Sequence, residues 1–137
     1  MAEVRTFDTG ATRDQDQTKY DFEGFLSGPV LMEFAAYMSK NRVQSDGNVR
    51  ASDNWQKGIP LDAYMKSAFR HFMDWWQLHR GYKVVRPENG VEQDMREAIC
   101  GLLFNVQGYL HEYLKDDALD KKIKGLKEAP TPIEGPF

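Results

Sequence analysis

The segment PLDAYMKSAFRHFMDWWQLHRG at residues 60–81 decides the fold of this chain, because its pattern predicts one long amphipathic helix. Its apolar residues recur at steps of three and four positions, the spacing of one face of an α-helix. We expect the helix to run from Pro60 to about His79 and to end before Gly81, a natural C-terminal glycine. The predicted core stripe consists of Leu61, Met65, Ala68, Phe69, Phe72 and Trp76.

A second side of this helix carries Ser67, Arg70, His71, Asp74 and Gln77 at helical spacing. A solvated helix face usually shows a loose mixture of Lys and Glu, whereas this one has a cation, an imidazole and a carboxylate within two turns. The pattern favours a functional site. A structural interpretation stays open, because a satisfied buried histidine beside core or interface tryptophans gives the same spacing.

Two further helices are expected. The first runs from Pro29 to about Arg42, and the third from about Val91 to Leu114, with Asn89 and Glu92 as a capping box. Between the first two helices, residues 43–59 form a long connection with a turn signal at 46–48; such loops are uncommon in compact domains unless they are functional. The core stripe predicted for the third helix consists of Met95, Ala98, Ile99, Leu102, Val106, Leu110 and Tyr113.

The fold class predicted from these elements is all-α: a compact bundle of three main helices plus a short C-terminal helix within 115–128. We see no strand pattern. Residues 1–18 are expected to be a flexible N-terminal arm, 19–128 a single helical domain and 129–137 a disordered tail. Because three helices make a thin core and leave aromatics such as Trp75 and Tyr109 exposed, we expect a homo-oligomer to complete the bundle.

Composition narrows the class of protein. The chain has 137 residues, a formal charge of −3 and 41% hydrophobic residues, which suits one globular domain and gives no reason to expect a nucleic-acid partner. Cys100 is the single cysteine, so an intrachain disulfide or cysteine zinc site is excluded. No apolar run approaches a membrane-spanning length and the first 20 residues lack a signal-peptide core, so we expect a cytoplasmic protein without a membrane partner.

The predicted third helix has an acidic face that includes two glycines: Asp94, Glu97, Gly101, Asn105, Gly108 and Glu112. Each glycine lowers helix stability by about 1 kcal/mol relative to alanine. The close approach of a neighbouring helix or of a ligand would offset that loss. We therefore interpret this face as the lining of a groove, against the alternative of a solvated acidic surface.

If the second and third helices are antiparallel, His71 and Asp74 converge with Asp94 and Glu97. Carboxylates with waters and substrate phosphates are the ligands that Mg²⁺ prefers. Nearby cations suit phosphate oxygens, and aromatic side chains suit a base. The cations are Arg70, Lys57 and Lys66, and the aromatic residues are Trp55, Trp75 and Tyr64.

The run DNWQKGIPLDAYMKSAFRHFMDWW and the later EAICGLLFNVQGYL resemble the phage family described as the dATP/dGTP diphosphohydrolase N-terminal domain. The resemblance covers about residues 19–114. Its motifs are a Lys-Tyr pair, an Asn-Trp-x-x-Gly element, an Arg-His pair followed by Trp, and a late Asn. They correspond here to Lys19-Tyr20, Asn54-Trp55 with Gly58, Arg70-His71 with Trp75, and Asn105.

The resemblance implies a bacteriophage-type hydrolase of the host cytoplasm that converts dATP or dGTP to the monophosphate and pyrophosphate with Mg²⁺ or Mn²⁺. The family is similar in outline to the all-α MazG-like nucleotide pyrophosphohydrolases, which carry two carboxylate pairs; here His71 stands in place of one carboxylate. The implied metal ligands are Asp74, Asp94, Glu97 and Glu33; the implied catalytic residues are Arg70, His71 and Lys57; the implied substrate-binding residues are Lys19, Asn54, Trp55, Lys66 and Asn105.

Two alternatives to an enzyme stay open at this point. One is a phage protein that binds or sequesters a purine nucleotide, or a signal derived from one, without turning it over. The other is a helical oligomer with a purely structural role.

Overall fold

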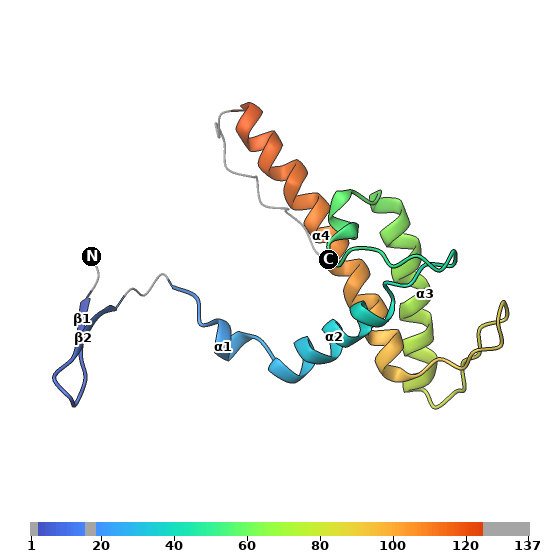
Figure 1. Cartoon of the computed structure of the whole chain (residues 1–137), viewed down its shortest axis with the longest axis horizontal. Helices are drawn as coiled ribbons and strands as arrows, with labels where there is room; N and C mark the ends of the chain where they lie inside the picture. Colours follow the sequence, from blue (N-terminus) through green and yellow to red (C-terminus); the bar gives the residue numbers. More distant parts are fainter. Residues whose placement is uncertain (1–2, 16–18, 125–137) are drawn as a thin grey trace, which may run out of the picture. The chain divides into compact units, whose positions relative to one another are not determined.

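The computed structural model describes residues 3–15 and 19–124, with side chains up to residue 117 (Figure 1). The described part of the chain is mostly helical and includes one two-stranded sheet. It divides into two compact units, residues 1–32 and 33–137, which are described separately below. The mostly helical class is therefore confirmed, whereas the prediction of a chain without strands is wrong.

The first unit begins with an antiparallel hairpin of strands β1 (Glu3–Thr6) and β2 (Thr12–Gln15). Its turn contains Gly10 at a φ of 87°, a left-handed conformation that glycine adopts at low cost. The segments EVRT and TRDQ lack an alternation of apolar and polar residues, so the pattern gave no strand signal. A single helical turn, α1 (Phe22–Phe25), follows, and the Asp21 carboxylate accepts a hydrogen bond from the Gly24 amide at 2.9 Å.

Helix α2 (Gly28–Lys40) begins and ends within two residues of its predicted bounds. The long connection that follows has more local order than the sequence indicated. Val43 and Val49 form an antiparallel bridge around the predicted turn, where Gly47 has a φ of 86°. A 3-10 helix, η1 (Asn54–Lys57), then leads into the second long helix.

Helix α3 (Leu61–His79) has almost the predicted bounds, but helix α4 (Met95–Lys124) does not. The expected capping box at Asn89 is wrong. Asp94 occupies that role instead, because its carboxylate accepts a hydrogen bond from the Glu97 amide at 2.7 Å. The separate helix expected within 115–128 is also wrong, since α4 continues to Lys124 without a Gly or Pro in its second half to stop it.

The two long helices pack against each other in antiparallel orientation (Figure 1). Near the start of α3, the Tyr64 ring lies against Gly108, and two turns later the His71 ring lies against Gly101. A Cβ atom at position 108 would lie 2.6 Å from Tyr64 Oη, and one at position 101 would lie 2.8 Å from His71 Cγ. The glycines of α4 therefore allow the rings of α3 to reach its backbone.

The glycine side of α4 packs against Tyr64 and His71 of α3, which agrees with the interpretation of this face as one that a neighbouring helix approaches closely. The predicted core stripes are mostly not buried: Phe69 and Val106 are exposed, although Ala98 is buried. Apolar spacing identifies a face that avoids water, but close helix contact requires small residues, and those lie on the other face. The buried apolar side chains of the described residues are Tyr64, Val84, Ala98 and Cys100.

Part of the predicted domain organisation lies outside the described residues. That part comprises residues 1–2 and 16–18 of the expected arm, residues 125–128 of the expected helical domain and the whole expected tail at 129–137. The flexibility of the arm and the disorder of the tail stay predictions. Among the described residues, no helix has both the length and the apolar character that a membrane span needs.

Candidate functional site

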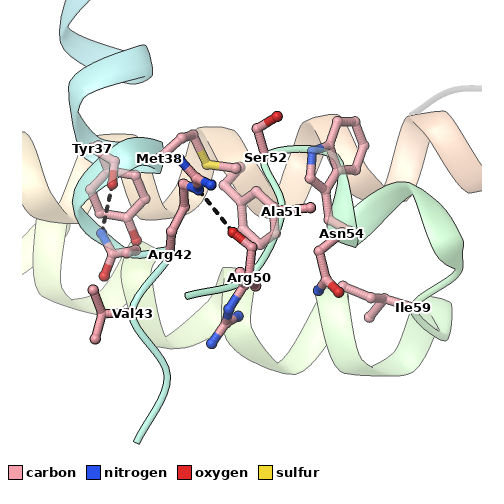
Figure 2. A pocket seen from close by; sticks show the side chains of 12 residues that line it. Tyr37, Met38, Arg42, Val43, Arg50, Ala51, Ser52, Asn54 and Ile59 are labelled. Carbon is pink, nitrogen blue, oxygen red and sulfur yellow. Dashed lines mark hydrogen bonds between the residues drawn. The ribbon is translucent and has the colours of Figure 1, made fainter. Parts of the chain in front are cut away.

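A pocket of about 330 Å³ lies between the end of α2, the connection that follows it and η1 (Figure 2). We call it the α2–η1 pocket. Figure 2 shows Tyr37 and Asn54 at opposite ends, with the side chains of Arg42 and Arg50 between them. Its volume is at the lower end of the range for small-molecule sites. Its polar and aromatic lining includes Tyr37, Asn41, Arg42, Arg50, Asn54, Trp55 and Phe104.

Hydrogen bonds fix the basic side of this pocket. The Arg42 Nε group donates to the Arg50 carbonyl at 2.8 Å, and the Arg50 amide donates to the Arg42 carbonyl at 2.9 Å. In Figure 2 the guanidinium of Arg50 extends away from this pair of bonds. Arg42 is half-buried and Arg50 is exposed, so Arg50 has the more accessible charge of the two. A guanidinium in this position is suited to bidentate contact with an anionic ligand.

Trp55 attaches the other end of the pocket to α4. Its ring meets His111 edge-on at a centroid distance of 4.8 Å and Phe104 at 6.3 Å. Lys115 adds a second attachment, because its ammonium donates to the Gln56 carbonyl at 2.9 Å. These contacts hold η1 against α4. The pocket that Asn54 and Trp55 line, both of them predicted substrate-binding residues, therefore has a fixed position relative to this helix.

A smaller hollow of about 120 Å³ adjoins the first pocket at Tyr37, which lines both. We call it the carboxylate hollow, because Glu33 and Glu97 line it. Both acids have cationic neighbours: Lys40 Nζ lies 2.6 Å from Glu97, and Arg96 lies 3.7 Å from Glu33. The hydrogen bond to Glu97 raises the pKa of Lys40, and burial, followed by the charge of Glu97, raises the pKa of Tyr37.

Asp74 and His71 lie elsewhere, within the α3–α4 contact. Asp74 is 7% exposed, and its Oδ2 atom lies 2.9 Å from Arg86, at an ion-pair distance without the alignment of a hydrogen bond. The buried Nδ1 atom of His71 has no hydrogen-bond partner among the described residues. Burial, and then the charge of Arg86, lowers the pKa of His71. The imidazole is therefore a neutral, half-buried ring that packs on Gly101.

The structure does not bring the other predicted site residues together in one place. Asn105 is 3% exposed, and its amide donates to the Gly101 carbonyl at 2.7 Å, within α4 and outside the α2–η1 pocket. Asp94 caps α4 through its hydrogen bond to the Glu97 amide. Lys57 is exposed at the end of η1, beside Trp55 in the chain. Lys66 and Arg70 are exposed on α3, and Lys19 belongs to the first unit.

The four predicted metal ligands do not fit Mg²⁺ as one set. Asp74 is paired with Arg86 and Asp94 caps a helix, and the described residues contain no cluster of three or more ligand side chains suited to a metal. Glu33 and Glu97 alone line one hollow. Both are paired with cations, Glu97 with Lys40 and Glu33 with Arg96, so an Mg²⁺ ion that takes its remaining ligands from water and substrate phosphates would have to displace these partners.

Sequence reasoning missed Tyr37, Arg42 and Arg50. No motif marked them, because Tyr37 lies on α2 and Arg42 and Arg50 come together only through the Val43–Val49 bridge. The unusual length of the 43–59 connection was the available signal that this region is functional.

Comparison of the chain with known protein families, with curated proteins and with solved structures finds no match in any of the three. The resemblance to the diphosphohydrolase family therefore stays a prediction.

Proposed function

We propose that the protein binds a purine nucleotide in the α2–η1 pocket and hydrolyses dATP or dGTP to the monophosphate and pyrophosphate. The observation that supports this best is the position of Tyr37, which lines both the α2–η1 pocket and the carboxylate hollow. A nucleotide in the pocket would thus extend its phosphates past Tyr37 towards Glu33 and Glu97.

The order of residues along the pocket suits this orientation. Trp55 offers an aromatic surface to a base, and the Asn54 amide offers both a donor and an acceptor to its edge. Arg42 and Arg50, nearer to Tyr37 than Asn54 is, offer charge-assisted hydrogen bonds to phosphate oxygens (Figure 2). Lys57, on the same short helix as Trp55, supplies a further cation.

Glu33 and Glu97 would hold Mg²⁺ or Mn²⁺, which, when bound, lowers the pKa of a coordinated water and offsets phosphate charge. Lys40 balances the charge of Glu97 in this structure. In this proposal Arg70, His71, Lys66 and Asn105 do not contact the nucleotide. Their predicted roles in catalysis and base recognition pass to Arg42, Arg50 and Asn54.

The test is to mix the purified protein with Mg²⁺ and each of the four deoxynucleoside triphosphates and to assay pyrophosphate. We expect release from dATP or dGTP, and at least a tenfold loss in a Glu33→Gln/Glu97→Gln variant. Lys66→Gln is the matched control, because it removes an exposed charge outside both hollows. Hydrolysis that is absent with every nucleotide, or unchanged in the double variant, would refute the enzymatic proposal.

Binding without turnover is the second candidate, and the ion pairs Lys40–Glu97 and Arg96–Glu33 favour it, since both acids already have partners. It requires the α2–η1 pocket but no metal. Calorimetry with dATP and dGTP in EDTA distinguishes the two candidates. Tight binding in EDTA with the nucleotide recovered intact would favour sequestration, whereas binding that requires Mg²⁺ would favour the hydrolase.

We also propose that the protein acts as a homo-oligomer in the cytoplasm, where the nucleotide pool lies (the host cytoplasm, if a phage encodes it). The exposed apolar residues of α3 and α4 support self-association, because contact with another copy would remove them from water.

A further inference from the structure

Helices α3 and α4 share one continuous apolar surface that their own contact leaves open. Phe69 on α3 is 63% exposed, and Val106 and Tyr113 on α4 are 54% and 55% exposed. Between the helices run two adjoining hollows of about 500 and 290 Å³, which share Met65 and Ala68. We call this surface the apolar face; its principal residues are Met65, Phe69, Phe72, Val106, Leu110 and Tyr113.

The other contacts of α4 lie on different sides of the helix and do not cover this face. The carboxylate hollow is formed against Glu97 and Cys100, and the α2–η1 pocket against Phe104. Tyr64 is the largest fully buried side chain of the described residues. A core of this size gives little of the apolar burial on which folding depends. The apolar face therefore needs a partner that is present whenever the chain folds.

The charges along α4 argue against a lipid surface as that partner. Helices that lie on membranes carry Lys or Arg along the polar flanks of the apolar stripe. Between Glu97 and Leu114, α4 contains no Lys or Arg, and Glu112 in this stretch is paired with Lys115. On α3 the exposed charges beside the face are of both signs, namely Asp62, Lys66 and Arg70. An uncharged helix face of this length is typical of a protein–protein interface core.

The area of the face is suited to a stable dimer. Its large side chains are each about half exposed. An aromatic side chain buries roughly 150–250 Å² when it is fully covered. Covering this face would therefore bury on the order of 800 Å² per chain, which is the usual contribution of one partner to a specific interface.

We propose that a second copy of this chain docks on the apolar face, so that two antiparallel α3–α4 pairs form a four-helix bundle. An antiparallel pair with one apolar side is half of such a bundle. The same surface serves both copies in a two-fold arrangement, so no other complementary patch is required. The second copy is also the partner that is always present in equal amount.

The test is the mass of the full chain in solution, measured by light scattering, together with the dependence of its melting temperature on protein concentration. We expect twice the chain mass of 15.8 kDa and a melting temperature that rises with concentration, because dilution favours dissociation. A wild-type chain that stays monomeric, with a melting temperature independent of concentration, would overturn the proposal.

Two matched variants locate the interface. Val106→Glu places a charge on the apolar face, and Val91→Glu places the same charge on a valine that is 51% exposed outside it. We expect Val106→Glu to give monomer or to unfold, and Val91→Glu to remain dimeric. A folded dimer with Val106→Glu would refute this face as the interface. Co-sedimentation with anionic vesicles tests the alternative partner, and a monomer that binds them would overturn the proposal in favour of lipid.

Discussion

The imidazole of His71 on α3 lies against Gly101 on α4, at a position where any side chain on α4 would collide with the ring. Together with the equivalent contact of Tyr64 and Gly108, it sets the separation and the register of the two long helices. His71, which the resemblance implied to be catalytic, thus has a structural role in this helix contact.

Gly101→Ala should destabilise the fold although alanine favours a helix by about 1 kcal/mol. Its Cβ would lie 2.8 Å from His71 Cγ, and overpacking of this kind costs about 1–3 kcal/mol. Because Cε1 and Nδ1 of His71 would be closer still, we expect the cost to lie in the upper part of this range, about 2–3 kcal/mol. The net loss is then about 1–2 kcal/mol in urea unfolding at fixed protein concentration. Gly28→Ala, which meets nothing within 4 Å, is the control. Adding His71→Ala should relieve the collision; a Gly101→Ala variant as stable as wild type would contradict the contact.

The stability of the fold should decrease as the pH falls below about 6.5, the ordinary pKa of histidine. Because the pKa of His71 is lowered in the folded state, the unfolded chain binds more protons in that range and gains stability relative to the fold. The charged groups that act on the ring are Arg70 and Asp74 of its own helix, Arg86 of the following connection and Glu97 of α4.

The pH effect is measured by urea unfolding at pH 7.5 and 5.5 in wild type and His71→Gln. We expect the difference between the two pH values to shrink in this variant. His79→Gln, at the exposed end of α3, should retain the wild-type difference. An equal pH dependence in wild type and His71→Gln would show that another group is responsible.

Arg86→Leu should lower the free energy of unfolding by about 3 kcal/mol, because it leaves the buried Asp74 carboxylate without its cation. Asp74→Asn in the same background should recover part of the loss. The control is Lys83→Leu, whose exposed pair with Glu92 at 3.5 Å should contribute less than about 1 kcal/mol. Similar losses in Arg86→Leu and Lys83→Leu would show that burial adds nothing to the Asp74 pair.

Arg50→Gln and Arg42→Gln should separate ligand binding from folding. Arg50 is exposed and its guanidinium extends away from the backbone bonds, so its loss should weaken nucleotide binding about tenfold, or about 1.4 kcal/mol, and leave stability unchanged. Arg42→Gln should weaken binding and also lower stability by about 1 kcal/mol, since its Nε group bonds to the Arg50 carbonyl. Calorimetry and thermal melting measure the two effects; unchanged affinity in both variants would argue against the α2–η1 pocket as the nucleotide site.

Local signals predicted much of the helical framework. The bounds of α3 and the approximate extent of α2 follow from apolar spacing, the prolines at 29 and 60 and the glycine at 81, all of which act within a few residues along the chain. The same kind of signal failed at the start of α4, where Asn89 was predicted as the cap and Asp94 takes that role in the structure. It also failed for the N-terminal hairpin, whose short polar strands lack an apolar pattern.

The candidate site was only partly predictable for the same reason. Asn54 and Trp55, which the resemblance marked as substrate-binding residues, line the α2–η1 pocket, and their role in binding stays a prediction. Tyr37 joins them from α2, Arg42 and Arg50 are paired by the Val43–Val49 bridge, and Asp74 takes Arg86 as its partner from a different segment. Spacing along one helix cannot reveal partners that another segment supplies.

The sequence by itself determined that two long helices form, that each has an apolar stripe, and that one glycine-bearing face requires a close neighbour. Only the tertiary structure decided which faces meet. The rings of Tyr64 and His71 fit only where α4 has no side chain, so the glycine face became the contact within the chain. The apolar stripes were left exposed, because apolar character favours burial but does not specify which surface covers the stripe.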